Sequence, residues 1–189
     1  VDLVISGSFG DLIALSGMNL KLTASGNDLA EIGSIIGEKL PATKEFKVQG
    51  RLTGSAKVLS LSEAQGSAHR GGLSLVLDGG IKDLLNFNDL DLVAKCSGKD
   101  LSEVGAIIDE KLPATNEFAV AGRLTGCAKA LSLKEAQGNA NRGSLQFTAN
   151  GAVKDLLTLS GMDLNSSLKG KNLKDFGEII EEKLRATDA

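Results

Sequence analysis

The stretch that decides the fold is residues 46–54, which read FKVQGRLTG. Apolar or small residues occupy the even positions, and Lys47, Gln49, Arg51 and Thr53 occupy the odd ones. Successive side chains of a β-strand point to opposite faces, so a period of two is typical of a strand with one apolar and one solvated face. We therefore predict a half-buried strand here.

The same alternation returns along the chain, at 59–61, more weakly over 64–68, strongly over 73–77 and again over 90–96. Residues that tolerate turn geometry fill the gaps between these runs, at 54–55, 62–63, 70–72 and 79–80. Short connections of this kind join antiparallel neighbours. The pattern predicts a mainly β fold, built as an antiparallel meander of five or six strands in each copy of the repeat described next.

This stretch belongs to a repeat with a period of 72 residues. The sequence LPAT at 40–43 recurs at 112–115, and as LRAT at 184–187. Residues 29–100 and 101–172 are identical at 41 of 72 positions. A fixed period of this kind indicates a repeat architecture. The chain therefore divides into a partial repeat (1–28), two full repeats (29–100 and 101–172) and a second partial repeat (173–189), which together form one continuous array.

Each copy also carries the signal of one short α-helix. Residues 28–31 (DLAE) and 100–103 (DLSE) have the spacing of a capping box, in which the first side chain and the acidic residue three positions on both satisfy exposed backbone N–H groups. Apolar residues from Leu101 to Leu112 then fall on one helical stripe, and Pro113 is expected to end the helix.

Composition argues against most enzymes and against nucleic acid as a partner. The chain has 21 basic and 24 acidic residues, a net charge of −3, which lacks the positive field that nucleic acid requires. Its one histidine and two cysteines are too few for a His/Cys zinc site. His69, Cys96 and Cys127 align with Asn141, Leu168 and Ser55 in the other copy, so none of them belongs to the repeated design. We predict no enzyme activity, no catalytic residue, no metal site and no cofactor; the redox state of the two thiols stays open.

The apolar face that the alternation predicts is the candidate functional surface, because a soluble chain rarely exposes a large contiguous apolar area. Either a second layer closes over it as an ordinary core, or a hydrophobic ligand covers part of it. The candidate lining residues are Phe46, Val48, Leu52, Leu73, Leu75, Leu77, Leu90, Leu92, Phe118, Val120, Leu124, Leu145, Phe147 and Leu164.

The order of the motifs resembles the AsmA-like family of bacterial envelope proteins, which includes AsmA and, more distantly, TamB. The resemblance lies in LPAT at 112–115, FAVAGRL at 118–124, AQG at 136–138, GSL at 143–145 and LSGMDL at 159–164, before the next helix signal. It implies a parent protein of Gram-negative bacteria, anchored in the inner membrane, that projects a long curved β-sheet into the periplasm. It also implies a role in phospholipid transport or outer-membrane assembly.

Two functional hypotheses follow. In the first, the repeats curl into a groove that shields acyl chains of phospholipid or a similar ligand without bond chemistry, beside adjacent repeats of the parent protein. In the second, the chain is a structural or adhesive repeat protein that binds other chains, or itself, through open strand edges.

Overall fold

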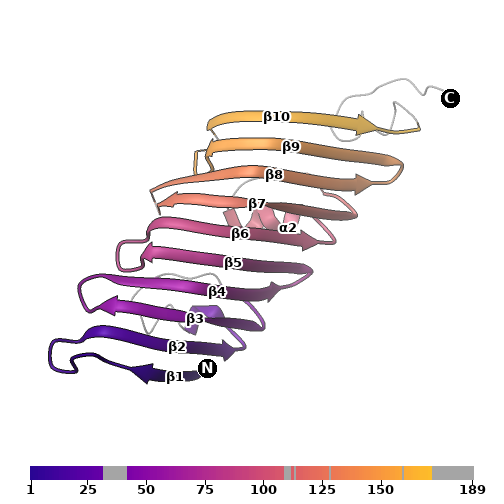
Figure 1. Ribbon diagram of the computed structural model, residues 1–189. Coiled ribbons are helices and arrows are strands. Elements are labelled where there is room, and N and C mark those ends of the chain that lie inside the picture. The colour runs from indigo at the N-terminus through magenta and orange to yellow at the C-terminus, as the bar shows by residue number, and fades with distance from the viewer. Residues whose placement is uncertain (32–41, 109–111, 113, 128, 159, 172–189) are drawn as a thin grey trace.

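The computed structural model describes residues 1–31, 42–108, 112, 114–127, 129–158 and 160–171, and all statements below concern these residues. Ten strands form a single antiparallel sheet in which the spatial order follows the chain, from β1 to β10 (Figure 1). The predicted mainly β fold and antiparallel meander are confirmed. The strands are β1 (Asp2–Ser8), β2 (Ser16–Gly26), β3 (Phe46–Ser55), β4 (Leu59–Arg70), β5 (Leu73–Asp83), β6 (Asn88–Gly98), β7 (Glu117–Cys127), β8 (Ala130–Arg142), β9 (Leu145–Asp155) and β10 (Ser160–Lys169).

The prediction of five or six strands per copy is wrong, because two expected turns lie inside strands. The described part of residues 29–100 contains four strands, β3 to β6. Ser62 and Glu63 lie within β4, and Gly79 and Gly80 lie within β5. Each copy therefore has fewer but longer strands than the turn signals indicated.

At Glu63 the chain forms a β-bulge and then continues in the same strand. Glu63 has a positive φ of 51°, and the pairing of β4 with β3 shifts register between Gln49 and Arg51. Gly50 lies opposite this bulge, where an added Cβ would approach the Leu61 side chain to 2.7 Å. The glycine thus leaves space for Leu61 to lie over the neighbouring strand, which a larger residue would prevent.

Gly79 was also expected in a turn, but the structure requires a glycine at this position for another reason. Its φ is +141°, and a Cβ at this position would lie 2.2 Å from the backbone oxygen of Asp91 on β6. Only glycine fits there, because the two backbones approach closely. The glycine permits β5 to run past this point without turning.

The two long connections, β2 to β3 and β6 to β7, carry the helical segments. Helix α2 spans Ser102–Ile108, and residues 29–31 begin a helix in the earlier connection. The rest of the stripe predicted up to Leu112 crosses residues 109–111, which with Pro113 lie outside the described part of the chain. Figure 1 shows α2 behind the sheet, on the face turned away from the viewer.

The predicted role of Asp100 as the helix cap is confirmed, whereas the predicted role of Glu103 in the capping box is wrong. Asp100 Oδ1 accepts hydrogen bonds from the backbone N–H of Ser102 at 3.0 Å and of Thr115 at 3.1 Å, while Thr115 Oγ1 accepts the N–H of Leu101 at 2.9 Å. Glu103 does not complete a capping box with Asp100. Its Oε2 accepts the N–H of Gly72 in the turn between β4 and β5, at 2.9 Å, because the helix crosses that end of the sheet.

The sheet is open and uncurled, and no second sheet packs on it within the described residues. The accessible surface is 12389 Å², whereas a compact monomer of 19.5 kDa exposes about 8500 Å². The core is correspondingly thin. It consists of Ala24, Phe46, Ala64, Leu73, Ile81, Leu92, Phe118, Ala136, Leu145 and Val153, all at or below 9% exposure.

Replacing Asp100 with Ala is expected to lower the melting temperature at pH 7 by roughly 2–4 °C, since two amides lose their acceptor. Hydrogen bonds from the backbone of Ser102 and Thr115 hold the pKa of Asp100 below its ordinary value. The stabilisation is therefore present above that ordinary pKa and is lost as the pH falls through the lower folded value. Thermal melts followed by circular dichroism should show the parent and variant converging below about pH 4.

Asp163→Ala, at an exposed site on β10, is the matched control and should leave the melting temperature unchanged at both pH values. Equal melting temperatures of the parent and Asp100→Ala at pH 7 would contradict this account of the connection.

Candidate functional site

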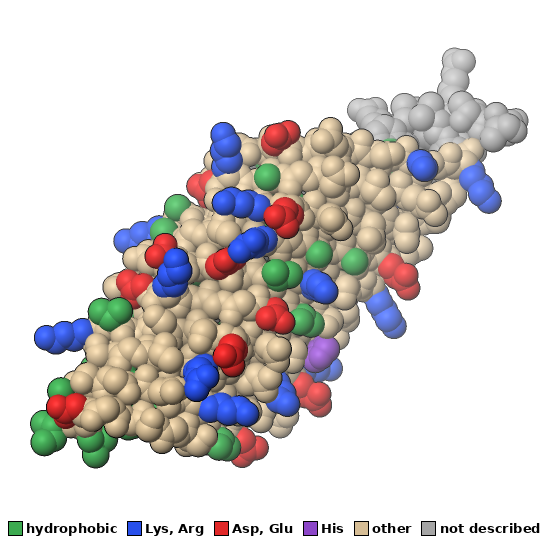
Figure 2. All heavy atoms as spheres, in the orientation of Figure 1, with side chains coloured by type: hydrophobic (Ala, Val, Ile, Leu, Met, Phe, Trp, Pro, Cys, Tyr) green, Lys and Arg blue, Asp and Glu red, His purple; other side chains and the backbone are tan. Residues whose placement is uncertain are grey.

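All fourteen predicted lining residues lie on one face of the sheet. The pairing of neighbouring strands connects them laterally, as in the row that runs from Phe46 through Ala68, Leu75 and Cys96 to Val120. Cross-strand partners share a face, so a single register keeps the apolar positions of ten strands together. We call this surface the apolar face. Its opposite, which faces the viewer in Figures 1 and 2, we call the polar face.

Coverage of the apolar face is uneven. Phe46, Leu73, Leu92, Phe118 and Leu145 are buried, and Val48, Leu52, Leu77, Leu90 and Leu124 are half-buried. Leu75, Val120, Phe147 and Leu164 are 37–42% exposed. The closed-core alternative would bury all fourteen, so the described residues form a core only in part.

A cavity of about 480 Å³ lies on the apolar face, between the second long connection and strands β8 to β10. Its lining is formed by Leu101, Ala114, Thr115, Ala140, Asn141, Arg142, Leu145, Phe147, Ser166 and Leu168. Leu145 and Phe147 were predicted, whereas Leu101 and Leu168 were not placed in the lining. The sequence could have identified Leu168 as a lining residue, because it aligns with Cys96 in the preceding repeat. In the structure, Leu168 pairs with Phe147 across β9 and β10.

The connection that borders this cavity is held by the hydrogen bonds of Asp100 and Thr115. The same arrangement occurs 72 residues earlier, where Asp28 Oδ1 accepts the N–H groups of Ala30 and Thr43, both at 3.0 Å. These bonds lower the pKa of Asp28, as the equivalent bonds do for Asp100. Both carboxylates therefore serve to fasten a long connection at the edge of the apolar face.

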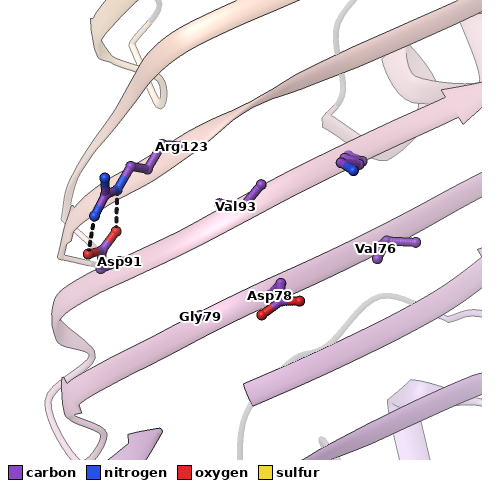
Figure 3. Close-up of a pocket in the computed structure, with 7 residues that line it drawn as sticks. Val76, Asp78, Gly79, Asp91, Val93 and Arg123 are labelled. Atoms are coloured by element: carbon purple, nitrogen blue, oxygen red, sulfur yellow. Dashed lines mark hydrogen bonds and ion pairs between the residues drawn. The ribbon is translucent and has the colours of Figure 1, made fainter. Parts of the chain in front are cut away.

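The polar face carries cross-strand charge pairs. Arg123 on β7 donates two hydrogen bonds of 2.6 Å to the carboxylate of Asp91 on β6, as Figure 3 shows. The guanidinium lowers the pKa of Asp91, and the carboxylate raises that of Arg123. Val76 and Asp78 on β5 and Val93 on β6 line a shallow hollow of the polar face together with this pair, and Figure 3 shows their positions along the two strands. Exposed pairs of this kind add little stability, so they mark a solvated surface.

The chemically reactive side chains are not gathered into a site. The imidazole of His69 is exposed at the end of β4, and among the described residues no hydrogen bond or ion pair engages it. Cys96 lies on the apolar face and Cys127 at the end of β7, both as free thiols. The described residues contain no group of three or more His, Cys, Asp or Glu side chains that could hold a metal ion. None of their helices has the length and hydropathy of a membrane-spanning helix.

Comparisons with models of protein families, with curated proteins and with solved structures found no match to this chain.

Cys96 provides a chemical test of the apolar face. Its neighbours in the register are Leu75 and Val120, and burial raises the pKa of its thiol. Because the thiolate is the reactive form, we expect iodoacetamide at pH 7.5 to alkylate Cys96 several-fold more slowly in the folded chain than in urea. Peptide mass spectrometry over a time course measures this rate. Equal rates in the two states would contradict the placement of Cys96.

Proposed function

We propose that this chain holds acyl chains of phospholipid against its apolar face, without bond chemistry, as a segment of an AsmA-like protein of the bacterial envelope. The single observation that supports this proposal most is the apolar face itself, which continues across ten strands and stays partly exposed. Strand spacing gives the sheet a width of about 43 Å from β1 to β10. Leu75, Val120, Phe147 and Leu164 keep exposed apolar side chains on this face, and a hydrophobic ligand could cover them.

The energetics of acyl-chain burial require only the exclusion of water. Each methylene removed from water contributes about 0.8 kcal/mol, so a 16-carbon chain gains roughly 12 kcal/mol before ordering costs. No specific polar group is needed. A surface with an apolar floor and without a gathered reactive site fits such a ligand better than it fits a small polar substrate.

The cavity of about 480 Å³ supplies a starting position for a chain. Such a volume is within the range of small-molecule sites, and Leu145, Phe147 and Leu168 give it an aliphatic and aromatic floor. We propose that further curling of the 72-residue repeats around the ligand closes this region into a groove, with the long connections as one wall. The periplasm, with the parent protein anchored in the inner membrane, is the compartment that the family resemblance suggests.

The proposal is tested by two neighbouring residues on opposite faces. Leu75 is 37% exposed on the apolar face, and Val76 is 44% exposed on the polar face. Leu75→Glu should reduce the phospholipid that co-purifies with the chain by at least about tenfold, because a carboxylate among acyl chains costs about 2.5–3.5 kcal/mol. Val76→Glu should leave the lipid content unchanged. Lipid extraction and mass spectrometry, normalised to protein, give the measurement.

A second pair of variants repeats the test at other positions, so that the result does not depend on Leu75 and Val76 alone. Val120 on the apolar face is 37% exposed and Val93 on the polar face is 46% exposed, so Val120→Glu and Val93→Glu should repeat the contrast. Parent protein with no phospholipid above a control preparation would contradict the proposal, as would equal loss in both members of each pair.

A second candidate function is that of a structural or adhesive repeat. It is favoured by β1 and β10, in which every residue is exposed and which each pair with one strand within the described residues. Unpaired strand edges can bind another chain by backbone hydrogen bonds. Val4→Lys on β1 would then abolish concentration-dependent assembly in sedimentation velocity. Lipid binding without assembly would favour the first function.

A further inference from the structure

A hollow of about 580 Å³ lies on the polar face over strands β1 to β4, at the end of the sheet that is lowest in Figures 1 and 2. Its charged lining residues are Lys21 on β2, Arg51 on β3 and Glu63 on β4, which leave one positive charge in excess. The other lining residues are uncharged and include the two hydroxyls of Ser6 and Ser8. A hollow of this volume can hold a small molecule.

The two basic residues of the hollow are direct cross-strand partners. Lys21 pairs with Arg51 in the register of β2 with β3, and both residues are exposed. Like charges directly opposite each other in a sheet repel and destabilise the pairing. An anion bound between the two side chains would remove this repulsion.

The protein neutralises the guanidinium of Arg51 only in part. Its Nε donates a hydrogen bond of 2.7 Å to Oδ1 of Asn19, which is an uncharged acceptor. Its Nη1 lies 3.9 Å from Oε1 of Glu63, too far for a hydrogen bond, and the Glu63 side chain is 76% exposed. A long and solvated ion pair contributes little. The guanidinium therefore keeps N–H groups that can donate to a bound oxyanion.

The charges around the hollow do not cancel its excess. On the polar face of strands β1 to β5, the charged residues outside the hollow are Asp2, Lys47, Asp78 and Lys82. They comprise two acids and two bases, so they balance each other.

The equivalent hollow 72 residues later shows how the chain neutralises the same arginine. There Arg123 takes the place of Arg51, and its Nε and Nη2 both donate to the carboxylate of Asp91 at 2.6 Å (Figure 3). The lining of this second hollow holds two acids and two bases, so it has no excess charge. Three exchanges between the copies separate the first hollow from the second: Ser6 for Asp78, Asn19 for Asp91 and Lys21 for Val93.

We propose that the hollow over β1 to β4 binds a phosphate group of a small soluble molecule. A phosphate monoester carries about 1.5 to 2 negative charges at pH 7 and three acceptor oxygens. It can therefore bridge Lys21 and Arg51 and also accept a hydrogen bond from the hydroxyl of Ser6 or Ser8. A monoanion gains less from two adjacent cations. The sheet separates this hollow from the apolar face, so the site does not depend on the proposed function.

Titration of the whole ¹⁵N-labelled chain with inorganic phosphate, followed by NMR at constant ionic strength, tests the proposal. Backbone amides at the hollow should shift saturably with phosphate and not with acetate. Lys21→Val and Asn19→Asp should each bind phosphate about tenfold more weakly, because the first removes a cation and the second gives Arg51 a carboxylate partner. The matched controls Lys95→Val and Asn165→Asp make the same changes of charge at exposed positions elsewhere on the polar face, and they should bind like the parent.

A transplant of the site supplies a test by gain of binding. The triple variant Asp78→Ser, Asp91→Asn, Val93→Lys gives the second hollow the residues of the first, so the chain should then bind two phosphates instead of one. All three positions are exposed, and each new residue already occupies the equivalent strand position of the other copy, so the fold should be retained.

Glycerol 3-phosphate should shift the same amides as inorganic phosphate, because the proposed ligand is soluble. A response to vesicles of phosphatidic acid alone would overturn this source of the phosphate. The proposal would also be overturned by a parent without a saturable shift at the hollow, by equal weakening in variants and controls, or by a transplant that gains no second site.

Discussion

The constraint on which the rest of the structure depends is the register of one antiparallel sheet. Side chains alternate between faces with a period of two, so a slip of one residue at any strand pair would mix apolar and polar residues. The observed pairings avoid this across all ten strands. They join Leu92 to Leu124 and Leu61 to Ile81 on one face, and Asp91 and Arg123 interact on the other. The separation of the two faces follows from this register together with the alternation of apolar and polar residues along each strand.

Domains usually bury the apolar face of a sheet against a second layer. Here the described part of the chain supplies only short helical segments, fastened by Asp100 and Thr115, and the accessible surface stays far above that of a compact monomer. The apolar surface that the described residues leave exposed is the surface on which we propose that a hydrophobic ligand binds. The polar groups of the molecule are meanwhile engaged in turns, connections and cross-strand pairs, and they do not converge on a catalytic centre within the described residues.

Much of this architecture could be predicted from the sequence, because its strongest signals are local. The alternation in residues 46–54 identified β3 and the face of each of its side chains, and the lateral pairing then placed all fourteen candidate residues together. The predictions failed where one residue type serves two purposes. Gly79 resembled a turn residue, yet its role is to let two backbones approach within the sheet. Glu63 resembled a turn residue and forms a bulge, while Glu103 resembled a capping acid and binds Gly72. These outcomes depend on partners distant in sequence, which a local pattern does not contain.

The central claim is that acyl chains lie on the apolar face, and photocrosslinking tests it most directly. A phospholipid with a diazirine near the end of its acyl chain would be bound to the whole protein, irradiated and mapped by peptide mass spectrometry. The account predicts adducts at exposed apolar-face positions such as Leu75, Val120 and Phe147 and none at Val76 or Val93. Equal labelling of the two faces, or no labelled residue on the apolar face, would contradict it.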